Sequence, residues 1–167
     1  MIRDSIIFAA VIAADRVTKM AVPRLMDLHQ SVPVIPNLFN FTYVRNTGGA
    51  FGILASWDSP MRRGFFIIAS VAAIVLLWFL YRQAASSSSR LLRFSFVFIG
   101  GGAFGNLYDR AISGEVVDFL DLYIGSYHWP AFNIADSAIS VGAVILAYLY
   151  FTGKADMLNG MQDPDAS

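Results

Sequence analysis

Hydrophobic and polar positions divide the chain into four long apolar segments. The clearest, residues 64–81, reads GFFIIASVAAIVLLWFLY and carries no charge. Its length approaches the ~20 residues that a helix needs to cross a hydrocarbon core of about 30 Å. Three weaker segments of similar length include polar residues: 5–22, 91–107 and 131–152. The pattern therefore predicts a mainly α membrane protein, a bundle of four transmembrane helices.

The first apolar segment also fits a cleavable leader. Charged residues precede an apolar stretch from Ser5 to Ala14, and small residues stand near Ala14, as in a secretory leader. Against this interpretation, Asp15, Thr18 and Lys19 follow at positions i, i+3 and i+4, which lie on one helical face. We interpret the segment as a helix whose polar face turns toward the interior of the bundle.

Residues 23–63, between the first and second helices, follow a different pattern. Two prolines oppose a helix there. Aromatic and polar residues alternate from Phe39 to Tyr43, the period-two pattern of a half-buried strand. Gly48 and Gly49 permit a tight turn. We predict a small β-rich cap on the extracytoplasmic membrane surface.

Composition agrees with a membrane protein. The 167 residues are 56% hydrophobic and 14% charged, with a mean hydropathy of +0.56, which is outside the usual balance of a soluble domain. The net charge is zero and no basic stripe occurs, so no nucleic-acid partner is expected. Cysteine is absent, which excludes thiol nucleophiles and disulfides. We predict a single domain, 1–167, with a polar turn at 83–90 and a disordered polar tail at 154–167.

Loop charge indicates the orientation of the helices. The loop between the second and third helices holds Arg82, Arg90 and Arg93 without acids, whereas the next loop sets Arg110 among acidic residues. Because short cytoplasmic loops collect Lys and Arg, both termini are predicted to be cytoplasmic. The long first loop also carries arginines, so a count of Lys and Arg over all loops hardly distinguishes the two orientations.

Polar stripes mark the last two helices. The fourth carries Asn133, Asp136, Ser137 and Ser140 at i, i+3, i+4 and i+7, and the third repeats this spacing with Gly102, Gly105, Asn106 and Asp109. Lipid offers no hydrogen-bond partners to the polar groups on such faces, so the stripes are predicted to face each other or a water-filled cavity. Residues 64–81 are predicted to form an apolar wall. The glycines are predicted to serve close helix packing. Asp15 with Lys19, and Asp109 with Arg110, also fit simple ion pairs.

Asp118 and Asp136 stand in very apolar sequence. An ionised side chain at a bilayer centre costs ~2.5–3.5 kcal/mol, so intramembrane acids are functional candidates by default. Two carboxyl groups within a few Å share one proton, and such a pair activates water as in an aspartic protease. Spacing alone does not show that the two acids meet. His128 fits an interfacial aromatic belt ahead of Pro130, which is expected in the first turn of the fourth helix.

Three other functions fit parts of this pattern. In a small proton-coupled transporter or channel, Asp118 and Asp136 would relay protons, although the internal repeats common in transporters do not occur. In a membrane assembly factor, the charges would only hold helices together. A serine protease is opposed by the lack of a G-x-S-x-G turn.

Five motifs resemble those of the bacterial lipoprotein signal peptidases, also called signal peptidase II. They are DRVTK from Asp15, NTGGAF from Asn46, GGAFGNLYDR from Gly101, VVDF from Val116 and FNIADSAI from Phe132. They occur in family order and cover nearly the whole chain. Two departures are Arg16, where Gln is common, and Gly49, where Ala is common.

The resemblance implies an inner-membrane aspartic endopeptidase that cuts prolipoproteins before a diacylglyceryl-modified cysteine. It implies no metal or organic cofactor, contact with membrane lipids, and inhibition by globomycin-type cyclic peptides; we expect a monomer with its active site near the extracytoplasmic surface. It assigns catalysis to Asp118 and Asp136. It assigns substrate binding or support to Asn46, Gly48, Asn106, Arg110, Asn133, Asp15 and Lys19. The second helix and the Phe-rich cap are expected to hold the acyl chains.

Overall fold

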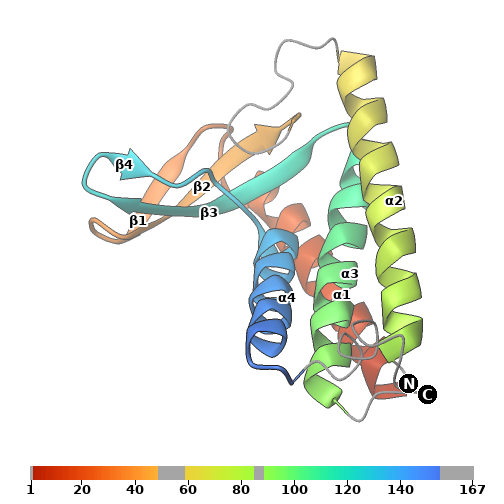
Figure 1. The fold of residues 1–167 in the computed structure, drawn as a ribbon. Helices are drawn as coiled ribbons and strands as arrows, with labels where there is room; N and C mark the ends of the chain where they lie inside the picture. Colours follow the sequence, from red (N-terminus) through yellow and green to blue (C-terminus); the bar gives the residue numbers. More distant parts are fainter. Residues whose placement is uncertain (1, 49–58, 85–88, 155–167) are drawn as a thin grey trace, which may run out of the picture.

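The computed structural model describes residues 2–48, 59–84 and 89–154. In chain order its elements are α1 (Ile2–Leu25), β1 (Ser31–Ile35), β2 (Phe39–Asn46), α2 (Ser59–Ala84), α3 (Arg90–Ile112), β3 (Val116–Ile124), β4 (Tyr127–His128) and α4 (Ile134–Phe151). The helices form a bundle, and the sheet projects from one end of it (Figure 1). The turn predicted at Gly49, the middle of the turn at 83–90 and the tail after Lys154 lie outside the described residues.

The helices occur where the apolar segments predict them, but their ends differ. The first three extend beyond the predicted bounds at both ends, because polar residues at a membrane surface continue a helix as well as apolar ones do. α4 begins later than predicted, since Asn133 caps it: the Asn133 side chain accepts a hydrogen bond from the backbone N–H of Asp136. Pro130 therefore precedes the helix, and its predicted place in the first turn is wrong.

The four strands of the described residues join one antiparallel sheet in the order β1-β2-β3-β4. Of these strands, β1 and β2 belong to the predicted cap. β3 and β4 come from the connection between α3 and α4, so the prediction of a cap built from residues 23–63 alone was incomplete. A bulge between Phe41 and Val44 shifts the β2–β3 register and sets Val44 opposite Asp118.

α3 lies at the centre of the bundle and packs against the other three helices. Glycines allow this contact. A Cβ added to Gly101 would lie 3.1 Å from Val11 of α1, and one added to Gly102 would lie 2.2 Å from the Ala135 carbonyl oxygen of α4. On the α4 side, a Cβ at Gly142 would lie 2.7 Å from the Ser95 carbonyl oxygen. The predicted role of the α3 glycines in packing is therefore confirmed, and Gly142 adds to it.

Two helices among the described residues are long and apolar enough to cross a membrane, Pro60–Ala84 and Ile134–Phe151. α2 leaves much of its apolar surface exposed, as expected of an apolar wall. α1 and α3 carry more charged residues, most of which are exposed or half-buried at the helix ends. The four-span prediction is thus supported by composition for two helices.

Gly102→Ala is expected to destabilise the bundle by about 1–3 kcal/mol or more, because the methyl group meets the backbone of α4 rather than a movable side chain. Thermal unfolding in detergent measures this. Gly100→Ala, on the same helix, is the matched control, since its Cβ meets only Phe8 at an ordinary 3.6 Å. Equal unfolding temperatures for the two variants would contradict the packing described here.

Candidate active site

Asp118 lies on β3 with its side chain buried at 3% exposure. The Nδ2 group of Asn46, at the end of β2, donates a hydrogen bond to Asp118 Oδ2 at 2.9 Å. The Nδ2 group of Asn133 donates to Asp118 Oδ1 at 2.7 Å. Burial raises the pKa of Asp118 to about 6; these hydrogen bonds oppose the rise, and the negative charge of Asp136 adds to it. The second acid therefore acts electrostatically on the first.

Asp136 lies in the first turn of α4. Its Oδ2 accepts a hydrogen bond from the backbone N–H of Asn133 at 3.2 Å, and Asn133 Oδ1 accepts one from the Asp136 N–H at 3.0 Å, which together make a capping box. Its Oδ1 accepts from Asn106 Nδ2 on α3 at 2.7 Å. Asn133 thus contacts both acids, one through its side chain and the other through the helix cap.

The two acids open into one pocket of about 590 Å³ where the sheet meets the bundle. Polar groups from β2, α3 and α4 line one part of it, and apolar side chains line the rest. The lining residues that lie outside the quoted sequence motifs include Leu122, Trp129, Pro130 and Val141. The pocket therefore combines a hydrogen-bonded acid pair with an apolar wall.

A buried ionic cluster supports the acids from the interior of the bundle. Lys19 Nζ lies 2.9 Å from Asp15 Oδ2 and 2.7 Å from Asp109 Oδ2, and it donates to Asn106 Oδ1 at 2.9 Å. Asp15 Oδ1 accepts from the backbone N–H of Ala135 at 3.0 Å. The cluster joins α1, α3 and α4, so the predicted convergence of the polar faces is confirmed.

The contacts of Asp109 differ from the predicted ion pair with Arg110. Asp109 pairs with Arg16 and Lys19 of α1 rather than with its neighbour Arg110. Sequence reasoning noted Arg16 only as a departure from the family pattern. Its position beside Asp15, at the edge of the polar face of α1, is the signal that could have identified it. Because α1 supplies the centre of the cluster, this segment is a part of the fold, and the interpretation as a separate leader is not supported.

Two further predicted residues also lie at the pocket. The backbone N–H of Gly48 donates to Asn46 Oδ1 at 3.0 Å, which leaves the Asn46 amide nitrogen directed at Asp118. Arg110 lines the pocket, with its guanidinium 5.2 Å from the centre of the Phe66 ring. Eight of the nine predicted site residues thus belong to the pocket or to the cluster beneath it, and the ninth, Asn133, contacts both acids.

His128 does not line the pocket. Its Nδ1 lies 2.9 Å from Asp121 Oδ1, and its ring stacks on Tyr123 with centroids 4.8 Å apart. Asp121 points away from Asp118, because positions three apart on a strand lie on opposite faces. This pair therefore belongs to the outer part of the sheet.

Comparison with known proteins agrees with this geometry. The family model described as signal peptidase (SPase) II matches residues 7–152. The lipoprotein signal peptidase of Desulforapulum autotrophicum is 46% identical over 149 residues, covering 89% of this chain and 91% of the relative. That of Geobacter metallireducens is 46% identical over 143 residues, covering 86% of each.

Two solved structures share the fold. A bacterial membrane enzyme determined by the in meso method at 2.3 Å has a TM-score of 0.79 and 30% identity, covering 92% of this chain and 90% of its own. A second, determined at 1.9 Å, has a TM-score of 0.76 and 29% identity, with 89% and 92% covered. The matched region spans the acid pair, the pocket and the ionic cluster, and on this extent of similarity the chain belongs to the signal peptidase II family.

Proposed function

We propose that this chain is an aspartic endopeptidase of the bacterial inner membrane that removes signal peptides from prolipoproteins, cutting before a diacylglyceryl-modified cysteine. The observation that carries the proposal is the acid pair, Asp118 and Asp136, opening into one pocket and joined through Asn133. Membership of the signal peptidase II family supports the substrate class.

The chemistry follows from the different surroundings of the acids. Asp118, with its raised pKa, holds the shared proton, and Asp136 acts as the base. Asp136 takes a proton from a water between the acids, and the water oxygen attacks the scissile carbonyl carbon. Asp118 donates a hydrogen bond to the oxygen that becomes negative. The C–N bond then breaks as the proton on Asp136 passes to the leaving amine.

The neighbouring residues divide into two groups by their contacts. Asn46 and Arg110 stand at the pocket surface, where they are available to hydrogen-bond the substrate backbone. Asn106 and Asn133 orient the acids, Gly48 orients Asn46, and Asp15 with Lys19 fixes Asn106. Lys19 and Asp15 are therefore structural supports rather than groups that touch substrate.

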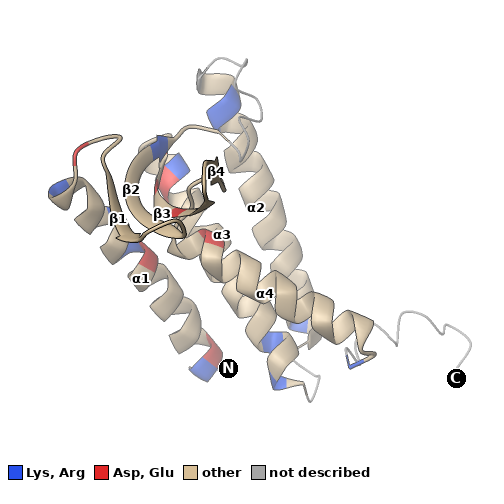
Figure 2. Cartoon of the chain, turned by 90° about the vertical axis from the view of Figure 1, so that its left-hand side faces the viewer, with Lys and Arg blue, Asp and Glu red and all other residues tan. Residues whose placement is uncertain are grey.

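We place all four helices across the membrane. At roughly 1.5 Å per residue, α1 with 24 residues and α3 with 23 are long enough, and their mid-bundle charges are paired with each other. Arg82 of α2 and Arg90 and Arg93 of α3 flank the short connection between these helices at the end away from the sheet, although Figure 2 shows basic residues at the sheet end of α2 as well. The bias of the short connection supports a cytoplasmic location for that end and for both termini. The pocket then opens at the extracytoplasmic surface of a protein that acts as a monomer.

Recognition of the lipid is assigned to the apolar part of the pocket. Leu122, Trp129 and Val141 provide a surface beside the acids for the diacylglyceryl group, and burial contributes about 0.8 kcal/mol for each methylene removed from water. Globomycin-type cyclic peptides are expected to compete for the same space.

Asp118→Asn and Asp136→Asn are each expected to lower turnover by about 10³-fold or more, because an amide neither accepts the proton of the water nor shares one with its partner. Cleavage of a diacylated precursor by purified protein measures this. Asp121→Asn, on the same strand but paired with His128, is the control and should keep most of its activity. Near-normal turnover in either active-site variant, with membrane insertion intact, would refute the mechanism.

The pH dependence of turnover should show the proton on Asp118. Below a pH of about 6 the carboxyl group is neutral and competent; as the pH rises through that value the proton is lost, and kcat falls on the alkaline side. The Asn46 hydrogen bond favours the charged form of Asp118. Asn46→Ala should therefore move the alkaline limb to higher pH. A limb that stays in place, or moves to lower pH, would show that Asp118 does not control it.

An unlipidated precursor should be a poor substrate, with kcat/KM lower by at least about 10²-fold, because it forfeits the apolar burial in the pocket. The two precursors are compared at equal concentration in the same detergent. Equal cleavage of both forms would rule out recognition through the acyl chains.

A further inference from the structure

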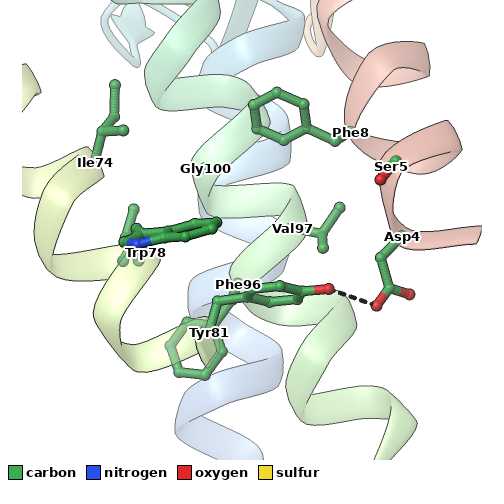
Figure 3. A pocket seen from close by; sticks show the side chains of 10 residues that line it. Asp4, Ser5, Phe8, Ile74, Trp78, Tyr81, Phe96, Val97 and Gly100 are labelled. Carbon is green, nitrogen blue, oxygen red and sulfur yellow. Dashed lines mark hydrogen bonds between the residues drawn. The ribbon is translucent and has the colours of Figure 1, made fainter. Parts of the chain in front are cut away.

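A second hollow opens on the side of the bundle between α1 and α2, at the end away from the sheet (Figure 3). Its volume is about 290 Å³. α3 forms the floor, and α1 and α2 form the walls. The lining residues are Asp4, Ser5, Phe8, Ile74, Leu77, Trp78, Tyr81, Phe96, Val97 and Gly100. Most of this surface is apolar, and none of it belongs to the active-site pocket.

The groove exists because α1 and α2 both pack on α3 but make little contact with each other. Gly100 has no side chain, which deepens the floor opposite Phe8. On α2 the lining residues recur at i, i+3, i+4 and i+7 from Ile74 to Tyr81, a stripe about 10 Å long. An apolar groove of this length beside a lipid-facing helix can hold a part of an extended hydrocarbon chain.

One end of the groove is polar and basic. Tyr81 reaches across α3 and donates a hydrogen bond to Asp4 Oδ2 at 2.8 Å (Figure 3). Arg93 Nε lies 3.7 Å from the same oxygen. The Arg82 guanidinium lies 5.4 Å from the centre of the Trp78 ring, which itself lines the groove. Arg3 and Arg90 are exposed at the same end of the helices. Guanidinium groups bind phosphate well.

We propose that this groove binds an anionic glycerophospholipid from the leaflet at this end of the bundle. One acyl chain lies along the Ile74–Tyr81 stripe, and the phosphate lies among the arginines at its polar end. The charge of those arginines selects an anionic headgroup over a zwitterionic one. A bound lipid would contact both α1 and α2, which make little contact with each other. The proposal rests on the membrane placement given above, but not on the chemistry of the acid pair.

Trp78 provides the probe, because the chain has three tryptophans and, of the two among the described residues, Trp78 lines the groove and Trp129 does not. The experiment uses the full chain with Trp57→Phe and Trp129→Phe, in phosphatidylcholine vesicles that contain a low fraction of phosphatidylglycerol. Bromine atoms are carried on the acyl chains of either one lipid or the other. At equal fractions, the brominated anionic lipid should quench Trp78 more strongly than the brominated zwitterionic lipid.

Two variants test the two halves of the site. Arg82→Gln should lower the relative affinity for the anionic lipid about fivefold. Gly100→Leu should fill the groove and reduce quenching by both lipids, whereas Gly100→Ala, whose Cβ meets Phe8 at 3.6 Å, should not. Equal quenching by both lipids in the parent protein would mean bulk lipid only and would overturn the proposal, as would unchanged selectivity in Arg82→Gln. Cleavage of prolipoprotein by the unsubstituted chain decides the proposed function separately.

Discussion

The buried ammonium of Lys19 is the constraint on which the rest of the site depends. Its side chain is only 2% exposed, and removal of such a charge from water costs several kcal/mol unless partners surround it. Asp15, Asp109 and Asn106 supply those partners from two helices, and Asp15 also accepts the Ala135 N–H of a third. The cluster is satisfied only when α1, α3 and α4 stand in one relative arrangement, and α2 takes no part in it.

This constraint passes to the active site through two amide side chains. An amide has a donor end and an acceptor end, so a group that binds the oxygen also directs the nitrogen. Lys19 binds the oxygen of Asn106, whose nitrogen then meets Asp136. The Gly48 N–H binds the oxygen of Asn46, whose nitrogen then meets Asp118. Each acid thus receives a donor whose direction is set by a group on the far side of the amide.

Patterns along the sequence predicted the features of the fold that depend on neighbouring residues. The lengths of the apolar segments predicted the helices, and the polar stripes predicted that the polar faces of the helices meet. Both predictions work because a bilayer penalises exposed polar groups over a whole segment. β3 was missed because Asp118 and Asp121, three apart, fall on opposite faces and break the alternation that identifies a strand. The Arg16–Asp109 pair joins residues 93 positions apart, and a bulge in β2 sets the register of Asp118 opposite Val44. Neither follows from sequence spacing.

The capping box on α4 has a consequence for how such an enzyme diversifies. Asp136 satisfies the first turn of its own helix while it faces the pocket, so a different rotamer would leave a backbone donor unpaired. The Asp136 side chain is therefore held in one orientation. In the proposed mechanism, adjustment to signal peptides of differing sequence falls to the sheet and to the apolar lining of the pocket, where mutations alter selectivity without disturbing the base. Substrate range and chemistry can thus evolve on separate parts of the chain.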